Sequence, residues 1–280
     1  MKGAAGATGL ILLSSPAAAI ASDTQTKAGK AMLIDVTKCV SCWWCYAACK
    51  EYNNLPETVK PDLNDPPPLS PDVWTTLHPE KKDGGWVSRK KACNHCTEAA
   101  CVEVCPTGAL SYNQMGYVQY DREKCSGCGY CAEYCPFEIP QMETNKVTGV
   151  SIMNKCTFCH DRVTNGEQPA CAAACTTGAI KFGDRNDLIT EARERLNELQ
   201  KSNSQASAYG IDELKGLHVM YVLDDSPGKY GLPEDPQVPV TSKVRDVFKW
   251  LGSGLAIAAL VGFGFNYLFV RLRMRSKAEK

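Results

Sequence analysis

The sequence lacks an excess of charge of either sign, because 31 Lys and Arg residues balance 31 Asp and Glu residues. No basic character therefore points to a nucleic-acid partner, and no acidic run indicates a solvating tail. A Gly-rich phosphate loop is also lacking, so binding of a nucleotide or flavin has no support. No Ser/His/Asp or paired-carboxylate constellation stands out from the background. We therefore predict no catalytic site in this chain, and no nucleic-acid partner.

The N-terminus lacks the charged start of a strong export signal. Lys2 is the only basic residue before the apolar run that begins at residue 10, and no Arg-Arg pair is present. A short apolar run at residues 10–13 and the small residues at 19–21 are nevertheless signal-like. Residues 1–29 are therefore predicted to be an N-terminal extension of signal-like character, and its cleavage stays open.

Cysteine is missing from both ends of the chain and concentrated in its middle, where all 16 cysteines lie between residues 39 and 175. They form four groups that each begin with C-x2-C and end with C-x3-C, while the gap between these pairs varies. The run C-x2-C-x2-C-x3-C of the first and third groups is the bacterial ferredoxin signature, so the pattern is a fourfold internal repeat. The groups are Cys39, Cys42, Cys45, Cys49; Cys93, Cys96, Cys101, Cys105; Cys125, Cys128, Cys131, Cys135; and Cys156, Cys159, Cys171, Cys175.

This spacing suits iron–sulfur chemistry. A cubane cluster needs four converging thiolates, and cysteines three apart on a short loop can supply three of them. In two-cluster ferredoxins the last cysteine of each run binds the other cluster, so the groups work in pairs. Structural zinc is the main alternative, but zinc sites are usually built from two separated C-x2-C pairs. Disulfides fit less well, because cysteines on tight loops are poorly placed for distant partners. We predict four 4Fe–4S clusters.

The fourth group also contains Cys156-x-x-Cys159-His160, the attachment pattern of a c-type haem. Sixteen thiolates make four complete four-thiolate sites, and giving two of them to a haem would leave one cluster incomplete. We therefore interpret His160 as a polar loop residue beside a cluster. His95, in the second group, is interpreted as facing solvent and receives no role.

The fold class predicted is α+β, with two ferredoxin-like modules. Short strands are expected at residues 31–36 and 116–120, and each cysteine turn is expected to give way to an extended apolar segment. Little room remains for an apolar core, so the clusters themselves should hold the fold together. The predicted organisation is a four-cluster domain at 30–183, with an outer module of 30–60 and 150–183 and an inner module of 88–149.

Two further features surround the first group. Trp43, Trp44 and Tyr46 make its loop unusually aromatic, and we interpret them as hydrophobic cover for a cluster, with partner docking as the alternative. The insert at residues 50–92 is rich in proline, so it is predicted to lack regular structure and to lie on the surface or against a partner.

A C-terminal extension at residues 184–249 follows the cysteine domain. From Asp187 onwards the apolar residues fall on one stripe, which predicts an amphipathic helix. A strand is expected at residues 217–223 and a turn-rich linker at 227–239. The stripe consists of Leu188, Ala192, Leu196 and Leu199.

Residues 250–270 contain no formal charge and are long enough for one transmembrane helix. Gly254, Ala258 and Gly262 are four residues apart, so one face is small enough for another helix to pack closely. The basic tail at 271–280 has five Lys and Arg residues, against three in the ten residues before the span. The C-terminus is therefore predicted to be cytoplasmic and the cluster domain to be outside.

Residues 30 to about 270 resemble the iron–sulfur β subunit of membrane-bound formate dehydrogenases, within the four-cluster subunits of molybdopterin oxidoreductases. The wider resemblance rests on the four cysteine groups in order, and the narrower one on several phrases and the single late span. The sequence departs from a ferredoxin pattern at Lys50 and Thr176, where proline might have followed, and at the Trp43-Trp44 pair. The phrases are Asp35-Val-Thr-Lys-Cys39, Cys128-Gly-Tyr-Cys131, Lys155-Cys-Thr-Phe-Cys159-His-Asp-Arg162, Gly216-Leu-His-Val-Met-Tyr-Val222 and Tyr230-Gly-Leu-Pro-Glu-Asp-Pro236.

The resemblance implies which cysteines share a cluster, with the outer groups paired and the inner groups paired. The implied ligands are Cys39, Cys42, Cys45 and Cys175 for cluster 1; Cys49, Cys156, Cys159 and Cys171 for cluster 2; Cys93, Cys96, Cys101 and Cys135 for cluster 3; and Cys105, Cys125, Cys128 and Cys131 for cluster 4.

The resemblance also implies partners and a location. Electrons from formate would leave a molybdenum or tungsten pterin subunit, pass through the four clusters and reach a membrane cytochrome b that packs on Gly254, Ala258 and Gly262. The expected site is the bacterial inner membrane, with the clusters in the periplasm. The alternative is the same role beside a polysulfide, nitrate or dimethyl sulfoxide reductase, or a hydrogenase. In each case the chain supplies position and potential rather than bond chemistry.

Overall fold

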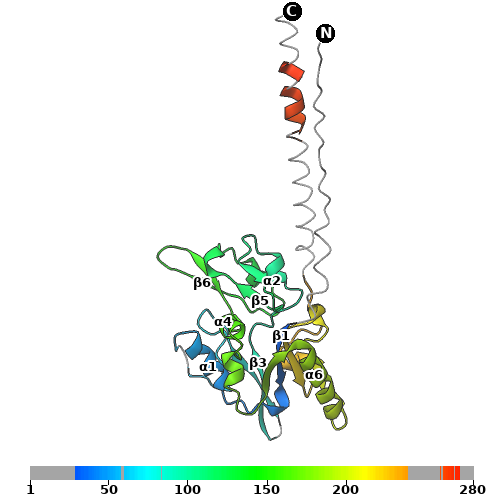
Figure 1. Ribbon diagram of the computed structural model, residues 1–280. Helices are drawn as coiled ribbons and strands as arrows, with labels where there is room; N and C mark the ends of the chain where they lie inside the picture. The colour runs from blue at the N-terminus through cyan, green and yellow to red at the C-terminus, as the bar shows by residue number, and fades with distance from the viewer. Residues whose placement is uncertain are drawn as a thin grey trace, which may run out of the picture.

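The computed structural model describes residues 29–57, 60–82, 84–238, 259, 261–267 and 269–271 (Figure 1). All sixteen cysteines are among them. All of the predicted extension at residues 1–29 except residue 29 lies outside the described residues, as does most of the predicted membrane span.

A four-stranded sheet brings together a strand that precedes the cysteine groups and strands that follow them. Its order is β8-β1-β10-β9; β1 pairs in parallel with β10 and antiparallel with β8. The strands predicted at residues 31–36 and 217–223 are confirmed to within two residues. The strand predicted at 116–120 is confirmed as the shorter β5 (Val118–Tyr120). The strands of the sheet are β1 (Lys30–Asp35), β8 (Ile180–Asp184), β9 (Ser207–Tyr209) and β10 (Val219–Leu223).

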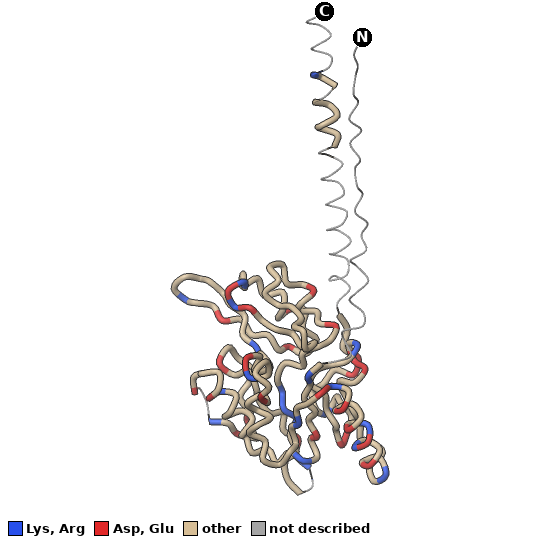
Figure 2. The backbone as a smooth tube through the Cα atoms, viewed as in Figure 1, with Lys and Arg blue, Asp and Glu red and all other residues tan. Residues whose placement is uncertain are grey.

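The predicted amphipathic helix is confirmed as α6 (Arg185–Gln200), which covers one face of this sheet (Figure 1). Leu188 and Ala192 are buried against Ala31 and Leu33 of β1. Basic and acidic residues alternate along the helix (Figure 2), as expected where its other side meets solvent. Because successive strand residues point to opposite faces, the next residues of β1 enter the core on the far side of the sheet.

That second face carries the main core. Met32 and Ile34 meet Tyr221 there, together with Phe158 from the fourth cysteine group. Phe158 also lies against Tyr117, with ring centroids 4.6 Å apart. Several cysteines pack against this core, so the cysteine loops are mounted directly on the sheet. The apolar core is therefore larger than expected from the sequence.

A second lobe stands beside the sheet and is built from two hairpins and two short helices (Figure 1). It has its own small core, in which Leu110, Val118 and Met153 meet Cys131. The elements are α2 (Ala100–Glu103), β4 (Leu110–Tyr112), β5 (Val118–Tyr120), α3 (Tyr130–Glu133), β6 (Gln141–Thr144) and β7 (Ser151–Asn154).

The prediction that the insert at 50–92 lacks regular structure is wrong for its second half. Residues there form an antiparallel hairpin of β2 (Thr76–Lys82) and β3 (Gly85–Lys91). Pro79 is accommodated because β2 has only one neighbour, so the missing N–H is not needed on its free edge. The hairpin could not be predicted from hydrophobic alternation, because the inward positions of β3 include the polar residues Ser88 and Lys90, both of which are buried.

The remaining helices are short and adjoin the cysteine groups. Asp35 accepts a hydrogen bond from the backbone N–H of Thr37, and Asp121 does the same for Glu123, so equivalent caps precede Cys39 and Cys125. These helices are η1 (Val36–Lys38), α1 (Trp44–Tyr52), η2 (Arg122–Lys124), α4 (His160–Thr164), α5 (Ala170–Ala173), η3 (Glu213–Lys215) and η4 (Pro227–Tyr230).

The predicted span at 250–270 can be followed only in part. Residues 259, 261–267 and 269–271 are helical, and the side chains of Phe263 and Phe265 are 75% and 74% exposed. Within the described part of the chain, no helix is long and apolar enough to cross a membrane. Gly254 and Ala258 lie outside the described residues, as do residues 272–280 of the basic tail.

Candidate cluster-binding sites

The four cysteine groups share a backbone conformation. The second residue after the first cysteine has positive φ in every group: 56° at Ser41, 48° at His95, 69° at Gly127 and 63° at Phe158. A left-handed residue turns the chain sharply, which lets both cysteines of C-x2-C reach one cavity. Three of the four are not glycine, so each holds strain of about 1 kcal/mol, as is common at functional sites.

The repeat continues beyond the first two cysteines. The third cysteine of each group lies in a short helix, α1, α2, α3 or α5. Positive φ returns three residues after the last cysteine at Gly108, Glu138 and Gly178. The first group departs from this pattern, because α1 continues past Cys49 to Tyr52. Lys50, at the position where the ferredoxin pattern has proline, is part of that continued helix.

The structure brings together the four cysteines expected for cluster 1. Cys39, Cys42 and Cys45 line one cavity with Cys175, which comes from the far end of the cysteine region. Cys175 Sγ also accepts a hydrogen bond from the backbone N–H of Ile180 over 3.4 Å. Hydrogen bonds to cluster sulfurs are a common means of setting their potential.

The cysteines expected for cluster 2 line a second cavity. Burial raises the pKa of Cys159 to about 12, and the thiolates of Cys156, Cys171 and Cys49 contribute to this rise. Crowded thiols of this kind become thiolates only when cations compensate their charge, which is what bound iron does.

The second lobe holds the cysteines expected for clusters 3 and 4. Those of cluster 4 line one cavity, together with Tyr120 and Met153. For cluster 3, burial raises the pKa of Cys96 well above its ordinary value, and its three expected partners raise it further. The cysteines expected for cluster 4 are Cys105, Cys125, Cys128 and Cys131. The cysteines expected to share cluster 3 with Cys96 are Cys93, Cys101 and Cys135.

The donor set of these cavities fits polynuclear iron. All sixteen cysteines are free thiols, and fourfold thiolate coordination is what 4Fe–4S clusters use. Among the described residues, no three His, Cys, Asp or Glu side chains converge closely enough to hold a single metal ion. The Lys90 ammonium, which lines the first cavity, is buried and has no hydrogen-bond partner among the described residues. Such a buried cation calls for an anionic group beside it, and a thiolate-bound cluster is one.

Electrostatic coupling between thiols of different sets indicates that the four sites follow one another in a row. The charge of Cys171 acts on Cys45, which connects cluster 1 to cluster 2. Cys156 acts on Cys93, which connects cluster 2 to cluster 3. Cys131 acts on Cys101 and thereby connects cluster 3 to cluster 4. The chain of neighbours therefore runs 1, 2, 3, 4.

Both ends of this row reach the surface. Cys42 and Cys128 are the two exposed cysteines among the sixteen, and they belong to the sets for clusters 1 and 4. All four cysteines expected for cluster 2 are buried, and those expected for cluster 3 are half-buried. Electrons could therefore enter and leave at the terminal sites, while the middle sites are shielded.

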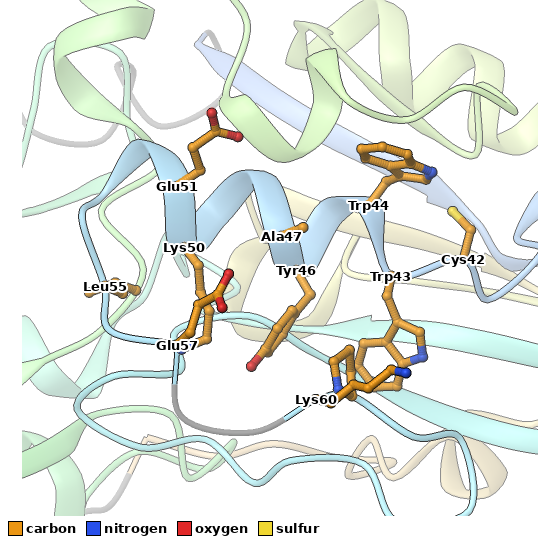
Figure 3. Close-up of a pocket in the computed structure, with 11 residues that line it drawn as sticks. Cys42, Trp43, Trp44, Tyr46, Ala47, Lys50, Glu51, Leu55, Glu57 and Lys60 are labelled. Carbon is orange, nitrogen blue, oxygen red and sulfur yellow. The ribbon is translucent and has the colours of Figure 1, made fainter.

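A wide pocket adjoins Cys42 (Figure 3). Trp43 and Trp44 leave the start of α1 in opposite directions, and both also line the cluster 1 cavity. The side chain of Tyr46 is buried, whereas Trp44 is 58% exposed. Tyr46 is not among the residues that line the cluster 1 cavity, whereas both tryptophans are, and Trp44 leaves an aromatic surface next to the exposed Cys42.

Two histidine interpretations are corrected. His95 does not face solvent: its exposed fraction is 0%, and its Nδ1 lies 3.0 Å from the carbonyl oxygen of Val118. The sequence could not show this, because the second lobe closes over the loop. His160 is the first residue of α4 rather than a loop residue, and its Nδ1 lies 2.8 Å from Tyr117 Oη.

Comparison with known proteins agrees with these sites. Two family models match the chain, each described as a 4Fe–4S dicluster domain, over residues 38–109 and 85–185. The formate dehydrogenase-O iron–sulfur subunit of Escherichia coli (strain K12) is 39% identical over 261 residues, which cover 88% of this chain and 82% of that protein. The nitrate-inducible formate dehydrogenase iron–sulfur subunit of the same organism is 37% identical, covering 86% and 85%.

The chain belongs to the formate dehydrogenase iron–sulfur subunit family. As an iron–sulfur subunit it binds four 4Fe–4S clusters and transfers electrons, and it is not the catalytic subunit. A more distant relative, the hydrogenase-2 operon protein HybA of Escherichia coli O157:H7, is 35% identical over 182 residues, which cover 59% of this chain and 55% of that protein.

Two buried lysines beside the cysteine sets of this iron–sulfur subunit were missed from the sequence. Lys90 and Lys155 are both 2% exposed, and both lie among thiols. Lys155 stands between the sets for clusters 2 and 3, since Cys93 and Cys156 both raise its pKa against the effect of burial. A lysine in a sequence normally indicates a solvated position, so only their closeness to cysteine groups could have drawn notice.

Proposed function

We propose that this chain conducts single electrons from a formate-oxidising subunit with a molybdenum or tungsten pterin to a cytochrome b partner in the membrane. The observation that carries the proposal is the row of four cysteine sets with one exposed cysteine at each end. A row with two accessible ends suits conduction between two partners. Its membership of the formate dehydrogenase family supports formate as the electron source.

We assign the cysteines to the four clusters in the same sets that the sequence led us to expect. The outer module, residues 30–60 and 150–183, would hold clusters 1 and 2, and the inner module, residues 88–149, would hold clusters 3 and 4. Support comes from the cavities, because cysteines from different groups line each of the three cavities found at clusters 1, 2 and 4. When bound, the clusters supply one-electron redox centres.

The chain's own residues position these centres and adjust their surroundings. Asn53 Nδ2 donates to Cys49 Sγ over 3.6 Å, and the backbone N–H of Phe158 donates to Cys156 Sγ over 3.5 Å. Donors to sulfur stabilise the more negative, reduced state and therefore raise the potential. Buried rings such as Phe158 exclude water from the same sites.

We further propose a membrane anchor at residues 250–270. The absence of formal charge over this stretch supports it, as do the exposed apolar side chains of the described helical residues, such as Phe263 and Phe265. The excess of basic residues at 271–280 supports a cytoplasmic C-terminus and a periplasmic cluster domain at the bacterial inner membrane.

We propose that a helix of the cytochrome b partner packs against the anchor face formed by Gly254, Ala258 and Gly262. A Cβ at Gly262 would meet nothing within 4 Å in this chain, so its own packing does not require glycine there. The same holds for Gly264, which is two residues away and lies on another face of the helix. Gly262→Leu should reduce copurification of the cytochrome subunit, whereas Gly264→Leu should not. If both variants copurified equal amounts of the cytochrome subunit, this packing face would be wrong.

A second candidate is the same conducting role beside a hydrogenase, which the similarity to HybA favours over other complexes. The two candidates differ only in the large subunit that donates electrons. Anaerobic purification from gently solubilised membranes would identify that subunit by mass spectrometry.

Iron content and reduction kinetics on the same sample test the main proposal. We expect about sixteen irons per chain, four for each cluster, and rapid bleaching of the cluster absorption on adding formate. Bleaching by hydrogen but not by formate would support the hydrogenase candidate. Few irons with bound zinc would overturn the electron-transfer proposal.

A further inference from the structure

Lys90 lines the cavity of the cluster 1 cysteines and is also electrostatically coupled to two cysteines of the cluster 2 set, Cys171 and Cys156. Lys90 lies on β3, and Ser88, on the same face of the strand, joins Ser41 of the first cysteine loop with their Oγ atoms 2.8 Å apart. The carbonyl oxygen of Lys90 accepts a hydrogen bond from Tyr221 Oη over 3.3 Å. Contacts on both sides therefore hold this part of β3 firmly against the core.

The ammonium group is buried, and it forms no ion pair with a carboxylate of the described residues. Its Nζ has no hydrogen-bond partner among the described residues, and it lines the cavity of the cluster 1 cysteines. The thiol groups whose charges act most on this ammonium are those of Cys171, Cys156 and Cys45. The counter-charges available to this buried cation therefore come from two different cysteine sets.

The influence is mutual. The Lys90 ammonium lowers the pKa of Cys45, opposing the effect of burial, and it does the same for Cys49 and Cys171. Cys45 is assigned to cluster 1, whereas Cys49 and Cys171 are assigned to cluster 2. A single cation thus faces the ligands of two neighbouring clusters.

We propose that Lys90 is a positioning residue for electron transfer, a buried cation shared by clusters 1 and 2 that raises the reduction potential of both. This inference rests on the proposed assignment of cysteines to clusters. Reduction adds one electron to an anionic cluster, so a fixed positive charge beside it stabilises the reduced form more than the oxidised form. The low-dielectric surroundings strengthen that effect, because the buried Nζ is shielded from solvent.

Sharing one cation also has a consequence for conduction. The first two sites of the row are shifted in the same direction, so an electron passing between them meets no large step in energy from this charge. Removing the charge should therefore affect two of the four clusters and leave the other two nearly unchanged.

Redox titration of the intact membrane complex, followed by electron paramagnetic resonance, tests the inference. Chemical mediators set the potential, so the result does not depend on formate oxidation and separates this inference from the proposed electron source. Lys90→Met removes the charge at similar length and should shift two of the four potentials to more negative values. Lys91→Met is the matched control, because this neighbour points to the other face of β3 and is half-buried.

The measured potentials and iron contents of these variants support or overturn the proposed role of Lys90. Unchanged potentials in Lys90→Met, or an equal shift of all four, would overturn the proposal, and so would the same shifts in Lys91→Met. Lys90→Arg keeps the charge and should keep the potentials of the unaltered protein. If Lys90→Met loses iron, Lys90→Gln provides a second neutral variant for titration. Iron loss in both neutral variants with retention in Lys90→Arg supports the need for a charge, whereas iron loss in all three overturns it.

Discussion

Arg195 Nε donates a hydrogen bond to Asp35 Oδ2 over 2.9 Å and so joins α6 to the residues that lead into the first cysteine loop. Arg195 Nη2 also donates to Thr37 Oγ1 over 3.1 Å. Asp35 is 5% exposed and caps the turn that ends at Cys39. The C-terminal extension therefore supports the first cysteine loop.

Arg195→Met should destabilise the protein and loosen cluster 1 first. Of the described residues, Lys38, 3.5 Å away, is then the one cation partner left to the buried Asp35 carboxylate. We expect a loss of about 1–3 kcal/mol, because a charged hydrogen bond disappears while its acceptor stays buried. The rate of cluster bleaching on warming measures this. Arg193→Met, an exposed position on the same helix, should bleach like the unaltered protein.

Gly127→Ala should disrupt the third cysteine loop much more than Gly129→Ala. Both glycines have positive φ, 69° and 79°, so both substitutions cost about 1 kcal/mol in backbone strain. At Gly127 the new Cβ would lie 2.1 Å from the carbonyl oxygen of Ser151, whereas at Gly129 it meets nothing within 4 Å. Iron per chain and thermal bleaching are the measurements. Similar losses in the two variants would show that strain alone governs this loop.

The sequence was informative where chemistry dictates spacing. The cysteine groups, the strands that precede them and the α6 stripe follow local patterns, and the structure contains them. Local patterns did not show the burial of Lys90 or His95, because each becomes buried only when distant segments pack over it.

The missed hairpin β2–β3 has the same physical origin. Its strands carry Lys, Arg, Ser and Pro at positions where an apolar pattern would be expected, so composition indicated a loop. Ser88 and Lys90 are directed inward toward other polar and charged groups rather than toward an apolar core. Polar burial beside a cofactor cannot be read from the hydrophobic pattern of a strand.

His218 should make stability depend on pH. It is fully buried, its Nδ1 donates to the carbonyl oxygen of Lys30 over 2.8 Å, and its Nε2 has no partner among the described residues. Burial lowers its pKa to about 4, from an ordinary value of about 6.5. A proton on Nε2 would place an unpaired charge in the core, so the folded state holds the neutral ring.

The sign of this effect follows from proton binding. Between about pH 6.5 and pH 4 the unfolded chain takes up a proton that the folded chain does not, so stability falls as the pH falls through this range. The total loss should be about 3 kcal/mol, complete near pH 4. His218→Asn does not titrate and should show a shallower decline in urea unfolding at a series of pH values. An identical slope in both proteins would contradict the assignment.

Cys45 and Cys49 are one helical turn apart on α1 but line different cavities, so they should serve different clusters. Cys45→Ala should remove the same paramagnetic signal as Cys175→Ala, and Cys49→Ala the same signal as Cys171→Ala. Each variant should lose about four irons, since one of four ligands of one cluster is missing. Electron paramagnetic resonance of the dithionite-reduced complex distinguishes the two signals. If Cys45→Ala and Cys49→Ala lost the same signal, both cysteines of α1 would belong to one cluster, and the proposed crossing of the first and fourth groups would be wrong.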